Sequence, residues 1–255
     1  MEGVVRVGIT QPRINLTHIN GGSSYIPQGT VTRQGVSDRF VSKAKHQNPV
    51  AAAIDDVLAE KAPRLFMKKY LNPKVLKEAA QRNPEIKAML KTKGLSDKFN
   101  IQNITGKSQE HFITTYNKAK ELGKYLPDQD RKTLIQAALL HDIGKAYIPS
   151  EILNKQGKLT PEEREIVDIH AALGREILKT TGLSPRVAHL AGLHHTPCDS
   201  PLKQGNMCAN ILSASDVYSA LKEERPYKPV FSDKQVAQIM HSDSKLDSKI
   251  VAKCF

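Results

Sequence analysis

The chain has 255 residues, enough for one or two globular domains. Apolar residues make up 39% and charged residues 25%, which is ordinary for a globular protein and excludes collagen-like and coiled-coil chains. No apolar run approaches the roughly 20 residues of a membrane-spanning helix, and no signal peptide follows Met1. We therefore expect no membrane insertion. Because the three cysteines form no CxxC pair, we also expect a reduced, cytoplasmic protein.

The net charge of +12 lies mainly in the first part of the chain. Residues 1–104 hold 17 Lys and Arg against 8 Asp and Glu, whereas residues 105–255 hold 21 against 18. A basic excess can attract nucleic acid or an anionic surface. Here the lysines are dispersed and no aromatic residues are interleaved with them, so solvated helix faces are favoured and nucleic-acid binding is not expected.

The first hundred residues divide into two regions. Residues 1–48 are rich in Gly, Ser, Thr, Asn and Gln and lack a sustained apolar period, so we expect them to be mostly disordered. Residues 49–104 are expected to form an accessory region of short helices that could contact a protein partner. Proline is favoured in a first helical turn, and Gly94 is a suitable stop. Four prolines mark the expected helix starts: Pro49, Pro63, Pro73 and Pro84.

From about residue 105 the apolar residues recur at helical spacing, and no long segment alternates as a strand would. Capping boxes, in which Ser or Thr is followed three residues later by Glu or Gln, mark two helix starts. They are formed by Thr160 with Glu163 and by Ser232 with Gln235. Another helix is expected to begin at Asp130 or Arg131. We therefore expect an all-α domain over residues 105–255.

Histidines recur on the apolar faces of these predicted helices. The helix that Thr160 opens is expected to run through Ile177 with His170 on its buried face, and His141 and His194 lie on two other apolar faces. A single buried His is usually a hydrogen-bonded core residue. Burying several imidazoles is costly unless they have partners, and a metal ion would supply them. His and carboxylate ligands suit Fe, Mn, Zn or Ni.

The sequence around these histidines resembles a known family. The run HDIGK at residues 141–145 resembles the signature of the HD superfamily of metal-dependent phosphohydrolases. The resemblance extends over about residues 105–255 and is closest to the HD-GYP branch. It implies an HD-domain helical bundle around a buried metal centre. Three stretches carry it: HDIGKAYIPSEILNKQGKLTPEEREIVDIHAALGREIL, the tandem His194-His195, and ILSASDVYSALKEERPYKP.

The resemblance also implies a set of metal ligands. Asp142 would bridge two divalent transition-metal ions, with Fe or Mn as the expected metals. The first ligand of the family precedes the HD pair by about thirty residues, and His111 is the candidate for it although its local pattern departs from the family's. The first ion would be held by His111, His141 and Asp216, and the second by His170, His194 and His195.

Three basic residues match phosphate binders of the family. They are Lys145 of the HDIGK run, together with Arg225 and Lys228 after the helix that carries Asp216. Asp142 and Lys145 would be the catalytic residues. The alternative interpretation of Arg225 and Lys228 is a solvated helix end.

One departure from the family concerns the substrate. After the tandem His the family reads roughly ErxDGxGYP, whereas residues 196–202 here read TPCDSPL, so the GYP triplet is missing. The resemblance implies a phosphodiesterase that hydrolyses a cyclic dinucleotide such as cyclic di-GMP through a metal-bridging hydroxide. Two alternatives stay open: an HD phosphohydrolase acting on another nucleotide, and a non-catalytic, metal-binding regulatory module.

Overall fold

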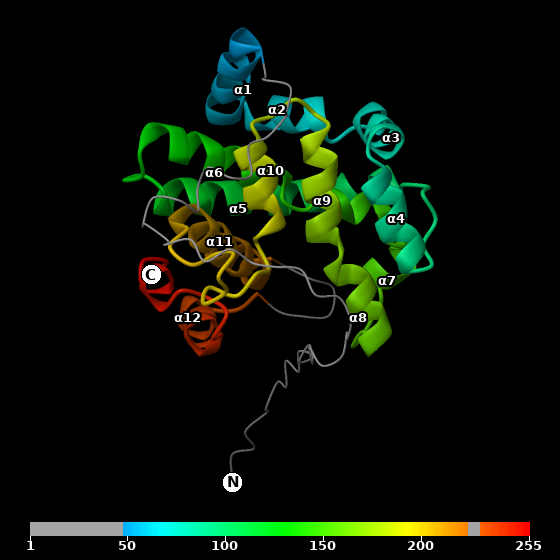
Figure 1. Cartoon of the computed structure of the whole chain (residues 1–255). Helices are drawn as coiled ribbons and strands as arrows, with labels where there is room; N and C mark the ends of the chain where they lie inside the picture. The colour runs from blue at the N-terminus through cyan, green and yellow to red at the C-terminus, as the bar shows by residue number, and fades with distance from the viewer. Residues whose placement is uncertain (1–47, 224–229) are drawn as a thin grey trace, which may run out of the picture. The chain divides into compact units, whose positions relative to one another are not determined.

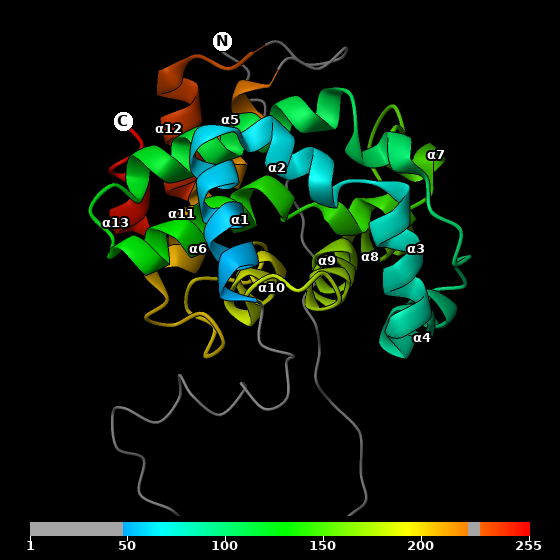
Figure 2. The ribbon, with the colours of Figure 1, turned by 90° about the horizontal axis from the view of Figure 1, so that it is seen from above.

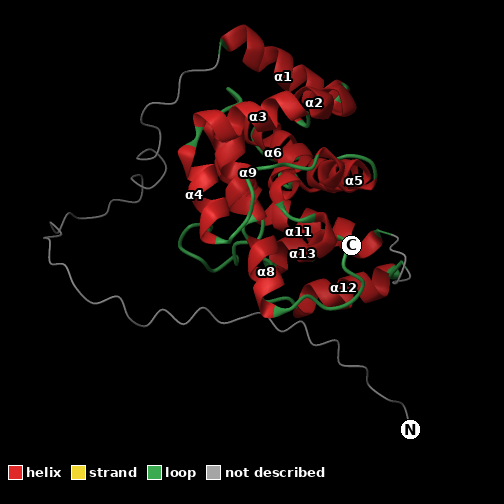
Figure 3. Ribbon diagram, turned by 90° about the vertical axis from the view of Figure 1, so that its right-hand side faces the viewer, coloured by secondary structure: helices red, strands yellow, loops and turns green. Residues whose placement is uncertain are grey.

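The computed structural model describes residues 48–223 and 230–255, and every regular element within these ranges is a helix (Figure 1 and Figure 3). The predicted all-α class is therefore confirmed. No described helix combines the length and apolarity needed to cross a bilayer. The predicted disorder of residues 1–48 lies outside the described residues, except at Asn48, which caps the first helix.

Short helices follow one another between residues 49 and 92, as the prolines predict. Each of the four has Pro at its start, where the missing N–H costs no helical hydrogen bond. The side chains of Asn48, Asn72 and Asn83 cap three of them by accepting a backbone N–H. Gly94, with φ of 67°, follows the last one. The helices are α1 (Pro49–Lys61), α2 (Pro63–Tyr70), α3 (Pro73–Arg82) and α4 (Pro84–Thr92).

The centre of the bundle is α6 (Asp128–Leu140), which is buried at every position from Thr133 onward. α1 and α2 pack against α6, and so do α5 (Lys107–Leu122), α10 (Pro185–Gly192) and α11 (Met207–Lys222). Because α6 is enclosed in this way, the residues that follow its C-terminal end begin deep inside the protein.

A second group of elements encloses that end. α9 (His170–Lys179) packs on α10 and on the 3-10 helix η2 (Ile143–Tyr147). Figure 2 shows the C-terminal helices α12 and α13 on one side of the described bundle and α3 with α4 on the opposite side. The remaining elements are η1 (Ile101–Ile104), α7 (Ser150–Leu153), α8 (Pro161–Asp168), α12 (Asp233–Ser242) and α13 (Ser248–Val251).

Two sequence predictions about helix bounds need correction. The helix expected from Asp130 or Arg131 begins at Asp128, after Pro127. The helix expected to run from Thr160 through Ile177 is broken at Ile169, so that α8 ends at residue 168 and α9 begins at His170. Both predicted capping boxes are present and open α8 and α12.

Candidate metal centre

The side chains proposed as ligands come from five places in the bundle. His111 is on α5, and Asp216 is in the middle of α11. His141 and Asp142 directly follow α6, and His170 is the first residue of α9. The tandem His194 and His195 lie in the turn that follows α10. Elements distant in the sequence thus bring seven nitrogen- or oxygen-bearing side chains to the end of α6.

One half of the cluster contains His111, His141 and Asp216. The Nε2 atoms of His111 and His141 lie 3.0 Å and 3.5 Å from Oδ1 of Asp216. The same two atoms lie 3.8 Å and 3.4 Å from Oδ2 of Asp142. All four side chains are buried.

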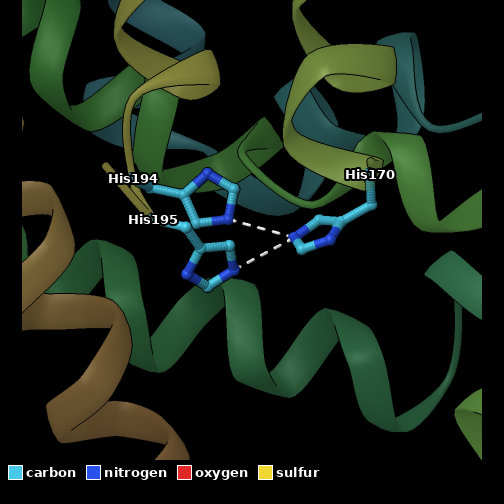
Figure 4. Close-up of side chains that lie close together, drawn as sticks. All are labelled: His170, His194 and His195. Atoms are coloured by element: carbon cyan, nitrogen blue, oxygen red, sulfur yellow. Dashed lines mark hydrogen bonds between the residues drawn. The ribbon is translucent and has the colours of Figure 1, made fainter. Parts of the chain in front are cut away.

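The other half contains three histidines that point toward one another (Figure 4). Nε2 of His170 lies 3.2 Å from Nε2 of His194 and 3.2 Å from Nε2 of His195. It also lies 3.0 Å from Oδ1 of Asp142. Donor atoms bound to one ion at about 2.1 Å and at right angles are about 3 Å apart, so this spacing suits a shared metal.

Asp142 stands between the two halves. Its Oδ2 atom faces His111 and His141, whereas its Oδ1 atom faces His170 and, at 3.6 Å, His194. A carboxylate that offers one oxygen to each group of ligands has the arrangement that a bridging ligand requires.

The tautomers of three histidines favour metal binding. Nδ1 of His141, His170 and His194 lies 3.0, 2.5 and 2.6 Å from the carbonyl oxygen three residues earlier in each case. A neutral imidazole that donates from Nδ1 keeps a lone pair on Nε2. The three Nε2 atoms are therefore presented to the cluster as potential ligands.

Some buried polar atoms of the cluster lack a hydrogen-bond partner within the described chain, among them Nε2 of His141 and Oδ1 of Asp142. An unsatisfied buried polar atom costs about 1–3 kcal/mol. Together with a donor set of imidazoles and carboxylates, this fits a divalent transition metal. The cluster can therefore hold metal.

Electrostatics keeps the two carboxyl groups ionised. Burial alone would raise the pKa of Asp142, but Lys145, His141 and His170 together lower it well below its ordinary value. Burial likewise opposes ionisation of Asp216, and His111 and His141 hold the pKa of that carboxyl well below its ordinary value. Both groups are thus carboxylates at neutral pH and can act as anionic ligands.

Of the predicted phosphate binders, the described residues include only Lys145. Its Nζ atom lies 2.5 Å from Oδ2 of Asp142, and its side chain is 28% exposed. Its positive charge thus lies at the solvent side of the cluster. Arg225 and Lys228 lie outside the described residues.

Sequence reasoning missed one buried residue beside this cluster. Lys203 lies in the loop before α11, is fully buried and bonds the backbone next to the tandem His. Its neighbours, Leu202 and Gln204, give no sequence signal of burial, because the enclosure comes from residues elsewhere in the chain.

An all-helical bundle that gathers His and Asp side chains at the end of a buried helix defines the class of an HD-type metal-binding domain. Residues 109–221 match the HD domain family. The resemblance of the HDIGK run is thereby confirmed.

Curated relatives share this region. The chain is 33% identical over 157 residues to a 3'3'-cGAMP-specific phosphodiesterase 3 of Vibrio cholerae, covering 59% of this chain and 33% of that protein. It is 32% identical over 170 residues to a cyclic di-GMP phosphodiesterase of the same organism, covering 57% and 35%. It is 30% identical over 152 residues to the cyclic di-GMP phosphodiesterase PdeB of Borreliella burgdorferi, covering 55% and 40%. The matched part is about a third of the length of these relatives.

Proposed function

We propose that the chain is a metal-dependent phosphodiesterase that hydrolyses a cyclic dinucleotide, with cyclic di-GMP as the first candidate. The observation that carries the proposal is the position of Asp142, with one oxygen toward each group of histidines. The names of the relatives support the substrate class, since each acts on cyclic di-GMP or 3'3'-cGAMP.

The proposed cofactors are two divalent ions, Fe or Mn, because imidazole and carboxylate donors suit such metals. Asp142 would bridge them. When bound, the ions would supply Lewis acidity toward the phosphate and generate a nucleophile from water at neutral pH. The terminal ligands would be His111, His141 and Asp216 on one side and His170, His194 and His195 on the other.

The chain's own residues would prepare the site for a phosphodiester. The bonds from Nδ1 to backbone carbonyls hold the rings of His141, His170 and His194 in one orientation. Lys145 would offer its charge to the phosphoryl oxygens, where negative charge grows in the transition state. Arg225 and Lys228 would likewise offer positive charge to the phosphoryl oxygens.

The first alternative is hydrolysis of another nucleotide. Residues 196–202 contain no aromatic side chain where the family has its Tyr, so contacts to the base would be looser. The second alternative is a non-catalytic module. Its weakness is that the set of candidate ligands is retained, whereas a domain that had lost its activity would be expected to have lost ligands.

The test is turnover by the full chain loaded with Mn²⁺ or Fe²⁺ under reducing conditions. Cyclic di-GMP, 3'3'-cGAMP, linear dinucleotides and simple nucleotide monoesters would be compared, with metal content measured on the same samples. We expect the cyclic substrates to be cleaved fastest. Turnover of nucleotides alone would favour the first alternative. No turnover by fully metallated protein would favour the regulatory module.

A further inference from the structure

Lys203 is a buried cation beside the tandem His turn. Its side chain is fully enclosed, and it forms an ion pair with no carboxylate among the described residues. Burial lowers the pKa of this amine to about 8. Asp243 and Asp247 favour the charged form, but an enclosed ammonium group with no carboxylate in ion-pair contact is still costly. The hydrogen bonds that it makes must therefore offset that cost.

Those hydrogen bonds hold the backbone on both sides of His195. Nζ of Lys203 donates to the carbonyl oxygen of Thr196 at 2.8 Å and to Oγ of Ser213 at 2.5 Å. The Ser213 hydroxyl in turn donates to the carbonyl oxygen of His194. One ammonium group thus fixes the carbonyl of Thr196 directly and that of His194 through a single hydroxyl.

The same contacts connect the two halves of the cluster. Ser213 is on α11, one turn before Asp216, which belongs to the other half. The link from Lys203 to Ser213 therefore joins the turn that carries the tandem His to the helix that carries Asp216. Both Lys203 and Ser213 are buried, so water does not compete for these bonds.

His195 has particular need of such support. The Nδ1 atoms of His141, His170 and His194 are each held by a backbone carbonyl. For His195 the structure describes a contact through Nε2, to His170, and no bond from Nδ1 to a described residue. The direction of its ring consequently depends on the backbone that carries it.

We propose that Lys203 is a positioning residue, which fixes the turn of His194 and His195 against α11 so that both imidazoles face His170 and Asp142. The inference rests on the proposed function, because it takes the two histidines to be metal ligands. Lys203 directly follows residues 196–202, the segment that departs from the family's pattern after the tandem His. Lys203 would therefore fix the tandem His turn from a loop whose sequence differs from that of the family.

The test is Mn²⁺ binding by the full chain, measured by calorimetry for wild type, Lys203→Met and Ser213→Ala. Supporting contacts behind metal ligands typically contribute 10–100-fold to affinity. We expect Lys203→Met to weaken Mn²⁺ binding at least about tenfold, and Ser213→Ala to weaken it less, since the direct bond to Thr196 remains. The thermal midpoint of each metal-free variant separates folding from positioning.

Lys118→Met is the matched control. Lys118 is also largely buried and donates to the carbonyl oxygen of Cys254 at 3.3 Å, but it pairs with Glu121 at 2.9 Å and has no described contact with the tandem His turn. Its Mn²⁺ affinity should equal that of wild type. Unchanged affinity in Lys203→Met, or a fall in the metal-free thermal midpoint alone, would overturn the inference.

Two further outcomes are decisive. If Lys203→Met fails to fold, Ser213→Ala must still weaken Mn²⁺ binding relative to Lys118→Met, and its failure to do so would overturn the inference. If wild type itself binds no Mn²⁺ or Fe²⁺, the proposed function fails. If wild type binds metal and Lys203→Met binds it equally well, only the positioning role fails.

Discussion

At the scale of single residues, Asp142 has the most demanding position in the protein. It is 1% exposed, it carries a negative charge, and its two oxygens face different groups of histidines. A buried anion of this kind costs free energy unless cations or protonated groups surround it. In the metal-free protein that role falls to Lys145 and to His141. Burial opposes the charged form of His141, but Asp142 and Asp216 raise its pKa to about 10. His141 must therefore lose a proton before its Nε2 atom can act as a metal ligand.

The first prediction concerns this carboxylate. Asp142→Asn keeps the shape of the side chain but removes its charge and one of its anionic oxygens. Because a bridging ligand serves both ions, we expect the variant to lose both metals and to have no measurable hydrolysis. Metal analysis after gel filtration measures this directly. Full metal content in Asp142→Asn would show that the bridging assignment is wrong.

The second prediction concerns Lys145. If its charge acts mainly on the phosphoryl oxygens in the transition state, Lys145→Met should lower kcat by about 100-fold and change KM little. Metal content must be measured alongside, because the ammonium is also 2.5 Å from Asp142. A rise in KM at constant kcat, with the metals retained, would instead assign Lys145 to ground-state binding.

At the scale of elements, structural features set by neighbouring residues were predictable from the sequence, whereas features set by distant residues were not. The capping box at Thr160 depends on residues within one turn, so the sequence alone located it. The break at Ile169 has no such signal, because the apolar period continues across it. The family motif pointed to the residues that meet in the cluster, and their role as metal ligands stays a prediction. The burial of Lys203 was not, because its partner Ser213 is ten residues away and on another element.

The N-terminal helices illustrate the same limit. Proline positions predicted where α1 to α4 begin, but not which faces they expose. On α1, Val50, Ile54 and Val57 are 66%, 51% and 60% exposed, and they recur at helical spacing. A protein partner for residues 49–104 stays a prediction, and this apolar face is where mutations should be placed to test it.

The third prediction concerns the junction of η2 and α9. A Cβ atom added at Gly144 would lie 2.0 Å from the carbonyl oxygen of His170 and 2.7 Å from the backbone nitrogen of Gly174. Because backbone atoms cannot rotate out of the way as a side chain can, Gly144→Ala should displace His170 from the cluster. We expect a loss of about 1–3 kcal/mol in the free energy of unfolding and weaker Mn²⁺ binding.

Gly192→Ala is the control for that prediction. An added Cβ there would lie 3.1 Å from Cβ and Cδ of Arg175, a milder contact than the 2.0 Å approach to backbone at Gly144. Chemical denaturation and Mn²⁺ titration of both variants give the comparison. Wild-type stability and affinity in Gly144→Ala would mean that the contact between η2 and α9 does not position His170.

At the scale of the whole described unit, the N-terminal helices and the HD domain share one core. A single apolar cluster extends from Phe66 and Leu76 in α2 and α3 to the centre of α6. Polar contacts cross the same boundary. Tyr147 donates to the carbonyl oxygen of Leu76 at 2.9 Å, and Arg131 bonds Glu60 at 2.6 Å. Helices outside the matched family region thus support η2, from which Lys145 projects.

The last prediction follows from that shared core. Leu76 is completely buried in α3, so Leu76→Ala should cost about 2–5 kcal/mol. Because its neighbours belong to one cluster, this loss of stability should lower the denaturant midpoint of a single cooperative unfolding transition. Guanidinium unfolding followed by circular dichroism and Tyr fluorescence measures this, with the exposed Lys77→Ala as control. If Leu76→Ala shifted only an early, separate transition and left the main one in place, α1 to α4 would be an independent unit that does not stabilise the metal centre.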